Sequence, residues 1–233
     1  MDTAIITGAS AGIGKAAAQL FVDDGFRVFN LSRRQCDIAA VESIPCDLSS
    51  EASLRQALEV LEPELPGAGR IGLVHNASQI RSDRADHCSS ADLLEVLQTN
   101  LVAANSLNQL ILPTMKPGSS VIYVGSTLAE KAVAWCFSYS VSKHAMAGMM
   151  RATCQDLMGR GIHTACVCPG FTNTEMLLTH LGNDQQLIES LATNNSFGRL
   201  VEATEIAALI HWVHHNPAVN GSVLHAHLGQ KES

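Results

Sequence analysis

The sequence predicts one α/β domain in which a parallel sheet of about seven strands is covered by helices on both faces, the doubly wound class. Short apolar runs alternate with longer helical stretches along all 233 residues. Such alternation is typical of parallel strands joined by crossover helices. No repeat, low-complexity tract or linker divides the chain, so residues 1–233 are expected to form a single domain.

Each element follows from its local pattern. Strands are expected at 4–6, 28–31, 71–74, 121–124 and 165–167, just before Cys46 and around Val223. Helices are expected at 13–24, 53–61, 91–115, 139–158 and 203–215, with a break near Thr99-Asn100. Only about ten residues, 34–43, separate the second strand from the third, which is hardly enough for a crossover helix. We expect a loop or a single turn there.

Composition excludes several classes of protein. The chain has 15 Lys+Arg against 22 Asp+Glu, a net charge of −7, and no basic block that would bind nucleic acid. No apolar run reaches the length of about 18 residues that a membrane span needs. Met1-Asp2-Thr3 lacks the cationic start of a signal peptide. Seven cysteines without a CxxC pair indicate reduced thiols and a cytoplasmic protein.

A glycine-rich turn follows the first expected strand and opens an alanine-rich helix. Gly8, Gly12 and Gly14 are spaced Gly-x-x-x-Gly-x-Gly. Glycine lets the backbone approach a pyrophosphate closely, and the helix N-terminus offers unpaired N–H groups and a partial positive charge. The turn therefore predicts a dinucleotide site formed by Gly8, Ser10, Ala11, Gly12, Ile13 and Gly14. The alternative is an ordinary strand-to-helix turn.

A second motif places Tyr139 and Lys143 four residues apart on one face of the helix expected at 139–158. A free tyrosine has a pKa of about 10, and a nearby cation favours its phenolate. Ser126 follows the strand 121–124, at the sheet edge where ligands bind in such folds. Its hydroxyl could bind a substrate carbonyl while Tyr139 donates a proton and a nicotinamide supplies hydride. A surface Tyr and Lys beside a turn serine is the alternative.

With both motifs, nearly the whole chain resembles the short-chain dehydrogenase/reductase family, which has a Rossmann-like fold. The resemblance implies that Ser126, Tyr139 and Lys143 are catalytic, with Asn100 completing the set through a water relay. It also implies cofactor contacts from Tyr139, Lys143, Asp47, Leu48, Asn76, Ala77, Pro169, Gly170, Thr172 and Thr174. Residues 175–196 would form a lid over the substrate, and the chain would form a homodimer or homotetramer.

The sequence departs from the family pattern at three places. Ser78 stands where glycine is usual and adds a side chain close to where the cofactor ribose would lie. Thr172 replaces an aliphatic residue in the segment that would hold the nicotinamide carboxamide. His227-Leu228 replaces Asp-Gly after the last strand, where the family often has a subunit contact.

The end of the second strand indicates which nicotinamide cofactor binds. An acid there would bind a ribose 2′-hydroxyl and repel a 2′-phosphate, which an arginine accommodates. Leu31 is instead followed by Ser32, Arg33 and Arg34. We expect NADP(H) rather than NAD(H), with Ser32 and Arg33 at the phosphate and Arg34 stacked on the adenine. A solvated basic turn is the alternative.

These observations favour an NADPH-dependent carbonyl reductase. Aromatic and leucine side chains at 135–137, 171 and 177–178 suggest a fairly apolar ketone or aldehyde. A non-catalytic NADP(H) sensor on the same fold and a methyltransferase with a related turn are alternatives, but neither needs the set Ser126, Tyr139, Lys143 and Asn100. His211, His214 and His215 have helical spacing, but no cysteine or carboxylate clearly joins them at ligand spacing, so no metal site is expected.

Overall fold

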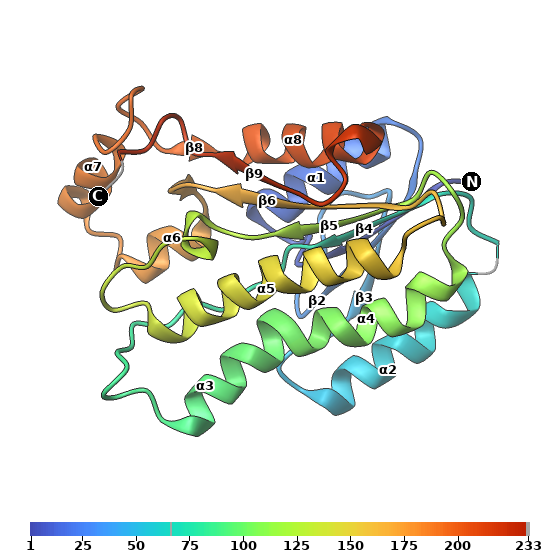
Figure 1. Cartoon of the computed structure of the whole chain (residues 1–233), viewed down its shortest axis with the longest axis horizontal. Coiled ribbons are helices and arrows are strands. Elements are labelled where there is room, and N and C mark those ends of the chain that lie inside the picture. The colour runs from blue at the N-terminus through green and yellow to red at the C-terminus, as the bar shows by residue number, and fades with distance from the viewer. Residues whose placement is uncertain (66, 232–233) are drawn as a thin grey trace.

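Seven parallel strands form the central sheet of the computed structural model, which describes residues 1–65 and 67–231 (Figure 1). Across the sheet they run in the order β3 (Val41–Pro45), β2 (Arg27–Ser32), β1 (Thr3–Thr7), β4 (Ile71–His75), β5 (Ser120–Val124), β6 (His163–Pro169) and β9 (Ser222–Ala226). Every neighbouring pair is parallel. The doubly wound sheet expected from the sequence is confirmed.

The central strands are apolar along their length because both of their faces are covered. Every residue of β1, β4, β5 and β6 is buried. In strands with one solvated face, apolar and polar residues would alternate. A separate two-stranded sheet pairs β7 (Thr172–Asn173) with β8 (Val201–Glu202). This small sheet lies where the chain leaves and re-enters the main domain around the expected lid.

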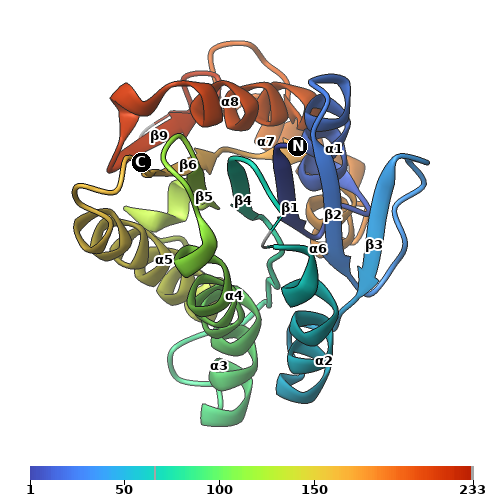
Figure 2. The same cartoon turned by 90° about the vertical axis from the view of Figure 1, so that its right-hand side faces the viewer.

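Helices form a layer on each face of the sheet (Figure 2). One layer contains α1 (Gly12–Asp23) and α8 (Ala203–His215). The other contains α2 (Glu51–Leu61), α3 (Ser90–Leu97), α4 (Ala103–Ile111) and α5 (Phe137–Asp156). Each helix layer packs on the sheet around a separate apolar core. Phe21 and Ile210 belong to the core on the α1 and α8 side. Leu54, Leu107 and Met150 belong to the core on the opposite side.

Two irregular features expected from the sequence are present. The long helical stretch is interrupted by a π-helical turn, η2 (Gln98–Val102), between α3 and α4, which confirms the break near Thr99-Asn100. Residues 33–40 between β2 and β3 form bends and a turn without a helix, as expected for so short a connection. Two helices begin two residues earlier than expected, at Glu51 and Phe137.

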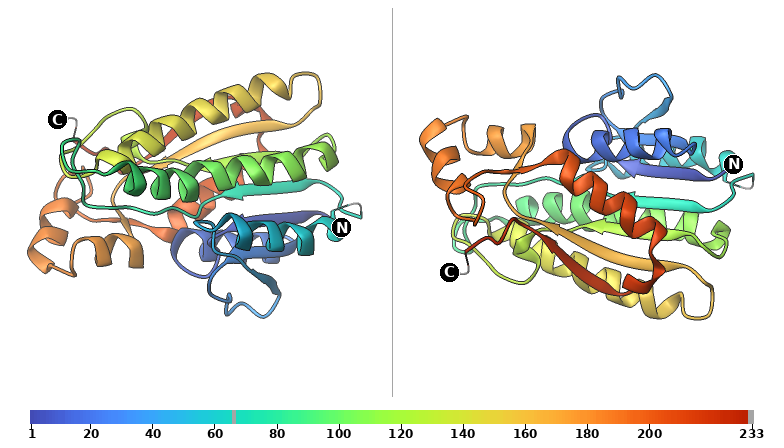
Figure 3. Two further views of the ribbon diagram at one scale, coloured as in Figure 1. Left: turned by 90° about the horizontal axis from the view of Figure 1, so that it is seen from below. Right: turned by 90° about the horizontal axis from the view of Figure 1, so that it is seen from above.

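The expected lid, 175–196, contains two short helices, α6 (Glu175–His180) and α7 (Gln185–Ala192). Both lie beyond the carboxyl ends of the strands, at one end of the molecule, as Figure 3 shows from two sides. The tail after β9 holds this region, since the Ser196 N–H donates to the Leu228 carbonyl (3.1 Å) and the Lys231 N–H to that of Asn194 (2.8 Å).

Short 3₁₀ turns complete the described chain: η1 (Glu62–Glu64), η3 (Leu112–Thr114), η4 (Thr127–Ala129) and η5 (Pro217–Val219). None of the helices in residues 1–65 and 67–231 is both long enough and apolar enough to cross a membrane.

Candidate active site

The glycine turn lies at the carboxyl edge of the sheet, between β1 and α1. Gly8 has φ +71°, a conformation that L side chains rarely adopt. A Cβ atom at Gly14 would lie 2.4 Å from the Gly8 carbonyl oxygen, so the first turn of α1 packs on the loop only if residue 14 is glycine. Ala11 at the N-cap provides no side-chain hydrogen bond to the first N–H groups of α1. Those donors and the helix dipole suit a phosphate.

Asn76 and Ala77, both expected cofactor contacts, hold this turn from the end of β4. The Asn76 side-chain amide donates to the carbonyl oxygens of Thr7 (2.9 Å) and Gly8 (3.3 Å). The Asn76 and Ala77 N–H groups donate to the Thr7 hydroxyl oxygen at 2.9 and 3.0 Å. The turn is therefore fixed in shape by the neighbouring strand.

Asn30 in β2 is a site residue that the sequence analysis missed. Its side chain is fully buried, and its Oδ1 accepts a hydrogen bond from the Ala9 N–H at 2.9 Å. Its Nδ2 donates to the Arg34 carbonyl (3.2 Å) and the Ser43 hydroxyl (3.1 Å). The Asn30 side chain thus connects the glycine turn to the loop that follows β2 and contains Arg33 and Arg34, called the basic loop below. The sequence could have indicated Asn30, because it is a polar residue inside an apolar strand and a buried polar group requires hydrogen-bond partners.

The basic loop after β2 differs in part from expectation. The Ser32 hydroxyl donates to the Arg34 carbonyl at 2.5 Å, which fixes the backbone of the loop. Arg33 is exposed on it. The guanidinium of Arg34 forms two hydrogen bonds, of 3.1 and 2.9 Å, with Glu175 at the start of α6. Arg34 is therefore paired with the first residue of α6 in this structure, whereas we expected it to stack on an adenine.

Asp47 and Leu48 follow β3. Hydrogen bonds from the Ser49 hydroxyl (2.7 Å) and N–H (3.0 Å) lower the pKa of Asp47, and the charge of Arg33 acts in the same direction. Asp47 is therefore an anion, close to the basic loop. Leu48 is buried in the core on the α2 side of the sheet, so its side chain packs inward.

Ser126, Tyr139 and Lys143 converge at the carboxyl end of β5. Ser126 caps η4, where its hydroxyl accepts from the Leu128 N–H at 3.1 Å. Tyr139 lies in the first turn of α5, and burial raises the pKa of its phenol to about 12, while the hydroxyls of Ser126 and Ser78 act to lower it. Ser78, which departs from the family pattern, thus faces the phenol.

Lys143 lies one helical turn after Tyr139 and is only 1% exposed. Its Nζ donates to the Val124 carbonyl at 2.8 Å and lies 5.4 Å from the centre of the Tyr139 ring. Burial lowers the pKa of Lys143 to about 8. The ammonium group thus lies close enough to act on the phenol electrostatically, and burial strengthens that action because the effective dielectric constant is low.

Asn100 lies buried in the π-helical turn η2, a kind of irregularity that is frequent at functional sites. Its Oδ1 accepts from the Gln79 N–H (2.7 Å), and its Nδ2 donates to the Gln79 carbonyl (2.9 Å) and the Ser142 hydroxyl (2.9 Å). The Ser142 hydroxyl in turn donates to the Tyr139 carbonyl at 2.7 Å. Asn100 is thus connected to the first turn of α5.

Two thiols lie beneath Ser126. The Sγ atoms of Cys166 and Cys168 are 3.7 Å apart, and a Cβ atom at Gly125 would lie 2.7 Å from each of them. The hydrogen bond between them raises the pKa of Cys166, as burial also does, and lowers the pKa of Cys168. A glycine is therefore required at position 125.

The sequence of this chain matches a known protein family. Residues 2–184 match the family model described as short chain dehydrogenase. The chain belongs to the short-chain dehydrogenase family. It is 28% identical to carbonyl reductase family member 4 of Danio rerio, over 95% of this chain and 94% of that protein. It is also 28% identical to human 3-oxoacyl-[acyl-carrier-protein] reductase, over 94% and 93% of the two chains.

Solved structures have the same fold. A blue fluorescent protein from a metagenomic library, solved in complex with NADPH, matches with a TM-score of 0.85 and 25% identity. The match covers 98% of this short-chain dehydrogenase and 97% of that chain.

The segment of this short-chain dehydrogenase after β6 leads from the candidate site to the expected lid, 175–196. Pro169 ends β6. A Cβ atom at Gly170 would lie 2.6 Å from the Cβ of His227, so His227, one of the residues that depart from the family pattern, packs against this segment. The Thr172 hydroxyl donates to the Gly170 carbonyl at 3.0 Å. The Thr174 hydroxyl caps α6, and the methyl group of the same side chain lies beside Gly12 of the glycine turn. The expected carboxamide segment thus lies next to the dinucleotide turn.

The aromatic residues before Tyr139 are not all at the site. Trp135 is 59% exposed, and the Arg84 guanidinium lies 5.0 Å from the centre of its ring. Trp135 and Phe137 line an open groove of about 930 Å³ that also contains Val141 and His144. Cys136 is buried. Trp135 therefore lies on an outer surface of the short-chain dehydrogenase domain beside α5.

Proposed function

We propose that this short-chain dehydrogenase reduces a ketone or aldehyde carbonyl to an alcohol with NADPH, and that Tyr139 donates the proton. The observation that carries the proposal is the convergence of Ser126, Tyr139 and Lys143 beside the glycine turn, at one edge of the sheet. Ligands of doubly wound sheets bind at that edge. A hydroxyl, a phenol and an ammonium group together suit the reduction of a carbonyl.

In the proposed reaction each group has a separate task. The Ser126 hydroxyl donates a hydrogen bond to the carbonyl oxygen and orients it. Bound NADPH supplies hydride to the carbonyl carbon. The oxygen, which gains negative charge, takes the proton of the Tyr139 hydroxyl and becomes the alcohol. Lys143 stabilises the resulting phenolate, because a nearby cation lowers the pKa of a phenol.

Asn100 acts as a positioning residue in this proposal. It connects to the Tyr139 carbonyl through the Ser142 hydroxyl, by bonds of 2.9 and 2.7 Å. That connection would hold the first turn of α5 and hence the phenol. A water relay through Asn100, which the family resemblance implies, would then return a proton to Tyr139.

The residues at the turn and the basic loop fit an NADP(H) molecule. The N–H groups at the start of α1, without a side-chain cap, would bind the pyrophosphate, and the cradle at Gly8 and Gly14 has no room for a side chain. Ser32 and Arg33 would bind the 2′-phosphate. Asp47 would contact the adenine, and Thr172 and Thr174 would lie near the nicotinamide. NADPH in the structure of the blue fluorescent protein supports this proposal.

The decisive experiment replaces Tyr139 with phenylalanine. The Tyr139→Phe variant should bind NADPH as tightly as the wild type and lose about 10²–10⁴-fold in kcat, the usual contribution of general acid catalysis. Tyr123→Phe is the matched control, because Tyr123 is the other tyrosine and its hydroxyl contacts only core groups, Asn108 and Thr153. Equal turnover by wild type and Tyr139→Phe would refute the mechanism.

The substrate is best sought with a carbonyl panel and NADPH consumption as readout. The name of one relative, a 3-oxoacyl-[acyl-carrier-protein] reductase, suggests acyl thioesters. Aromatic diketones, steroids and pterins complete the panel. We expect fairly apolar ketones or aldehydes to react fastest. Tight NADPH binding without reduction of any of these classes would instead favour the non-catalytic sensor.

We also propose that the chain forms a homodimer or homotetramer in the cytoplasm. Val102 (44% exposed) and Val141 (38%) lie on η2 and α5, and leave apolar surface for a second subunit. Light scattering that gives the mass of a monomer would refute the assembly. The free state of the seven cysteines supports a reducing compartment, and cell fractionation tests it.

A further inference from the structure

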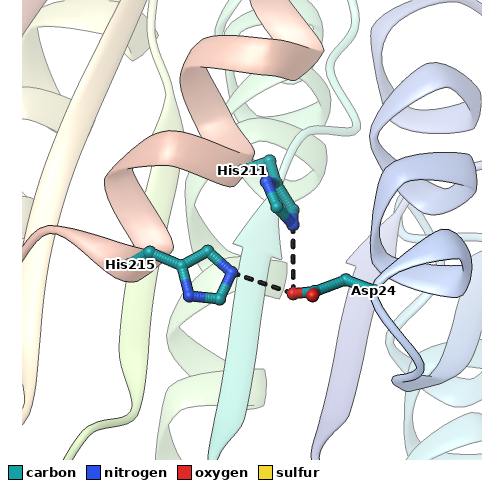
Figure 4. Close-up of side chains that lie close together, drawn as sticks. All are labelled: Asp24, His211 and His215. Atoms are coloured by element: carbon teal, nitrogen blue, oxygen red, sulfur yellow. Dashed lines mark hydrogen bonds and ion pairs between the residues drawn. The ribbon is translucent and has the colours of Figure 1, made fainter.

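Three potential metal ligands meet on the layer formed by α1 and α8 (Figure 4). The Nε2 atoms of His211 and His215 lie 3.2 and 2.9 Å from Oδ2 of Asp24, and the ligand atoms all lie within 4.8 Å of one another. Asp24 follows the last residue of α1. It lies ten residues after Gly14, the last glycine of the turn, a length of about 15 Å along the helix.

The fold holds the three side chains in place. His211 and His215 are four residues apart on α8 and therefore share a face. The Asp24 backbone caps α1, since its N–H donates to the Leu20 carbonyl at 3.0 Å. The Phe21 ring packs edge-on against His211, with centroids 5.3 Å apart. The two helices therefore present these groups to each other with little freedom.

From the sequence we expected no metal site because no carboxylate clearly joined the histidines, but the fold brings one beside them. No carboxylate clearly joins the histidines at ligand spacing in the sequence, whereas Asp24 lies 187 residues before His211. Parallel packing of the first and last helices on one face of the sheet brings it there. His214, the third histidine of that run, is buried, and its Nδ1 lies 2.7 Å from the Ser120 hydroxyl, so it takes no part in the cluster.

We propose that Asp24, His211 and His215 bind a Zn²⁺ ion. Two imidazole nitrogens and one carboxylate oxygen suit zinc, whereas Mg²⁺ and Ca²⁺ prefer oxygen ligands. Ligand atoms about 2.0–2.2 Å from a tetrahedral ion lie about 3.3–3.6 Å apart. The two nitrogen–oxygen separations found here, 3.2 and 2.9 Å, need to open by only a few tenths of an ångström. The side chains are 39%, 26% and 34% exposed, so an ion can enter and a water molecule can complete the tetrahedron.

Binding needs one change in the imidazoles. Each Nε2 must present its lone pair to the ion, so each neutral ring carries its proton on Nδ1. The ion then replaces the hydrogen bonds to Asp24 as the link between the ends of α1 and α8. Because the unfolded chain does not bring the three ligands together, zinc would stabilise the folded state.

Calorimetric titration of the untagged, chelator-treated full chain with ZnCl₂ tests the site. The wild type should bind one ion per chain, and its Tm should rise with zinc. His211→Gln, His215→Gln and Asp24→Asn should each weaken binding at least tenfold, while MgCl₂ should give no binding. His225→Gln is the matched control, since His225 contacts a single carboxylate, Glu130, at 2.8 Å, and it should bind zinc like the wild type.

Two results would overturn the proposal. One is absence of zinc binding by the wild type, and the other is undiminished binding by the three cluster variants. Their Tm without metal shows whether they fold. Absorption of Co²⁺ bound to the wild type gives a second readout that needs no variant: bands of a nitrogen and oxygen site are expected, and a thiolate-to-cobalt charge-transfer band would assign the metal to cysteines instead.

Discussion

The guanidinium of Arg34 forms a two-point ion pair with the carboxylate of Glu175, 141 residues further along the chain. It joins the basic loop, where we place the 2′-phosphate of the cofactor, to the first residue of the lid. Both side chains are more than 60% exposed, so the pair itself contributes at most about 1 kcal/mol to stability. We therefore expect its main effect on cofactor binding and on the position of α6.

We expect Glu175→Gln to lower the KM for NADPH about two- to threefold and to leave the Tm nearly unchanged, because an exposed ion pair contributes little to stability. The substitution removes a negative charge near the phosphate and frees Arg34 to reach it. Steady-state kinetics with varied NADPH measures the change. Glu189→Gln, on α7, is the control and should behave as the wild type. A higher KM in Glu175→Gln would mean that the ion pair instead holds the lid over the cofactor.

Arg33→Ala should raise the KM for NADPH about 10–100-fold and leave that for NADH almost unchanged, since a hydrogen bond to a charged group contributes about 1.5–3 kcal/mol. The ratio of the two KM values is the measurement. Arg55→Ala, on the exposed surface of α2, removes an equal charge away from the loop and should leave the ratio intact. A wild type that prefers NADH would contradict the proposed cofactor.

Asn30→Leu should destabilise the protein by about 1–3 kcal/mol, because the buried Ala9 N–H loses its partner. It should also raise the KM for NADPH, since the glycine turn and the basic loop lose their shared contact. Urea unfolding and kinetics together test both effects. Loss of stability with an unchanged KM would show that Asn30 supports the sheet alone.

Burial of Lys143 predicts a pH dependence of stability. The pKa of Lys143 is about 8 in the folded protein against an ordinary value of 10.5, so the unfolded chain binds more protons between these two pH values. Stability should therefore rise with pH in that window, by up to about 3 kcal/mol in total. Lys143→Met removes this contribution. Urea unfolding measures the free energy of unfolding of both proteins. From pH 8 to 9.5 the value for the wild type should rise relative to the value for Lys143→Met.

A second lysine provides the control for that experiment. Lys131→Met should show no such pH dependence relative to the wild type. The window ends below pH 10 because the raised pKa of Tyr139 acts in the opposite direction above its ordinary value of 10. A constant difference between wild type and Lys143→Met from pH 7 to 9.5 would mean that Lys143 keeps its ordinary pKa in the fold.

Local sequence patterns predicted most of the fold and the centre of the candidate site. The glycine spacing and the four-residue step from Tyr139 to Lys143 act within one turn or one helix, so they can be seen in the sequence. Contacts between distant segments could not be predicted in this way. The ion pair of Arg34 with Glu175 and the approach of Asp24 to His211 depend on which helices pack together. The direction in which Trp135 points depends on its positive φ of 66°, which the sequence does not indicate.

One carbonyl group, that of Arg34, accepts hydrogen bonds from both the Ser32 hydroxyl and the Asn30 amide. The path of the basic loop is thereby set by residues 30 and 32. The side chain at position 33 is exposed. In the proposed cofactor site, redesign for a different nicotinamide coenzyme can therefore start from residue 33, on a backbone that residues 30 and 32 hold in place.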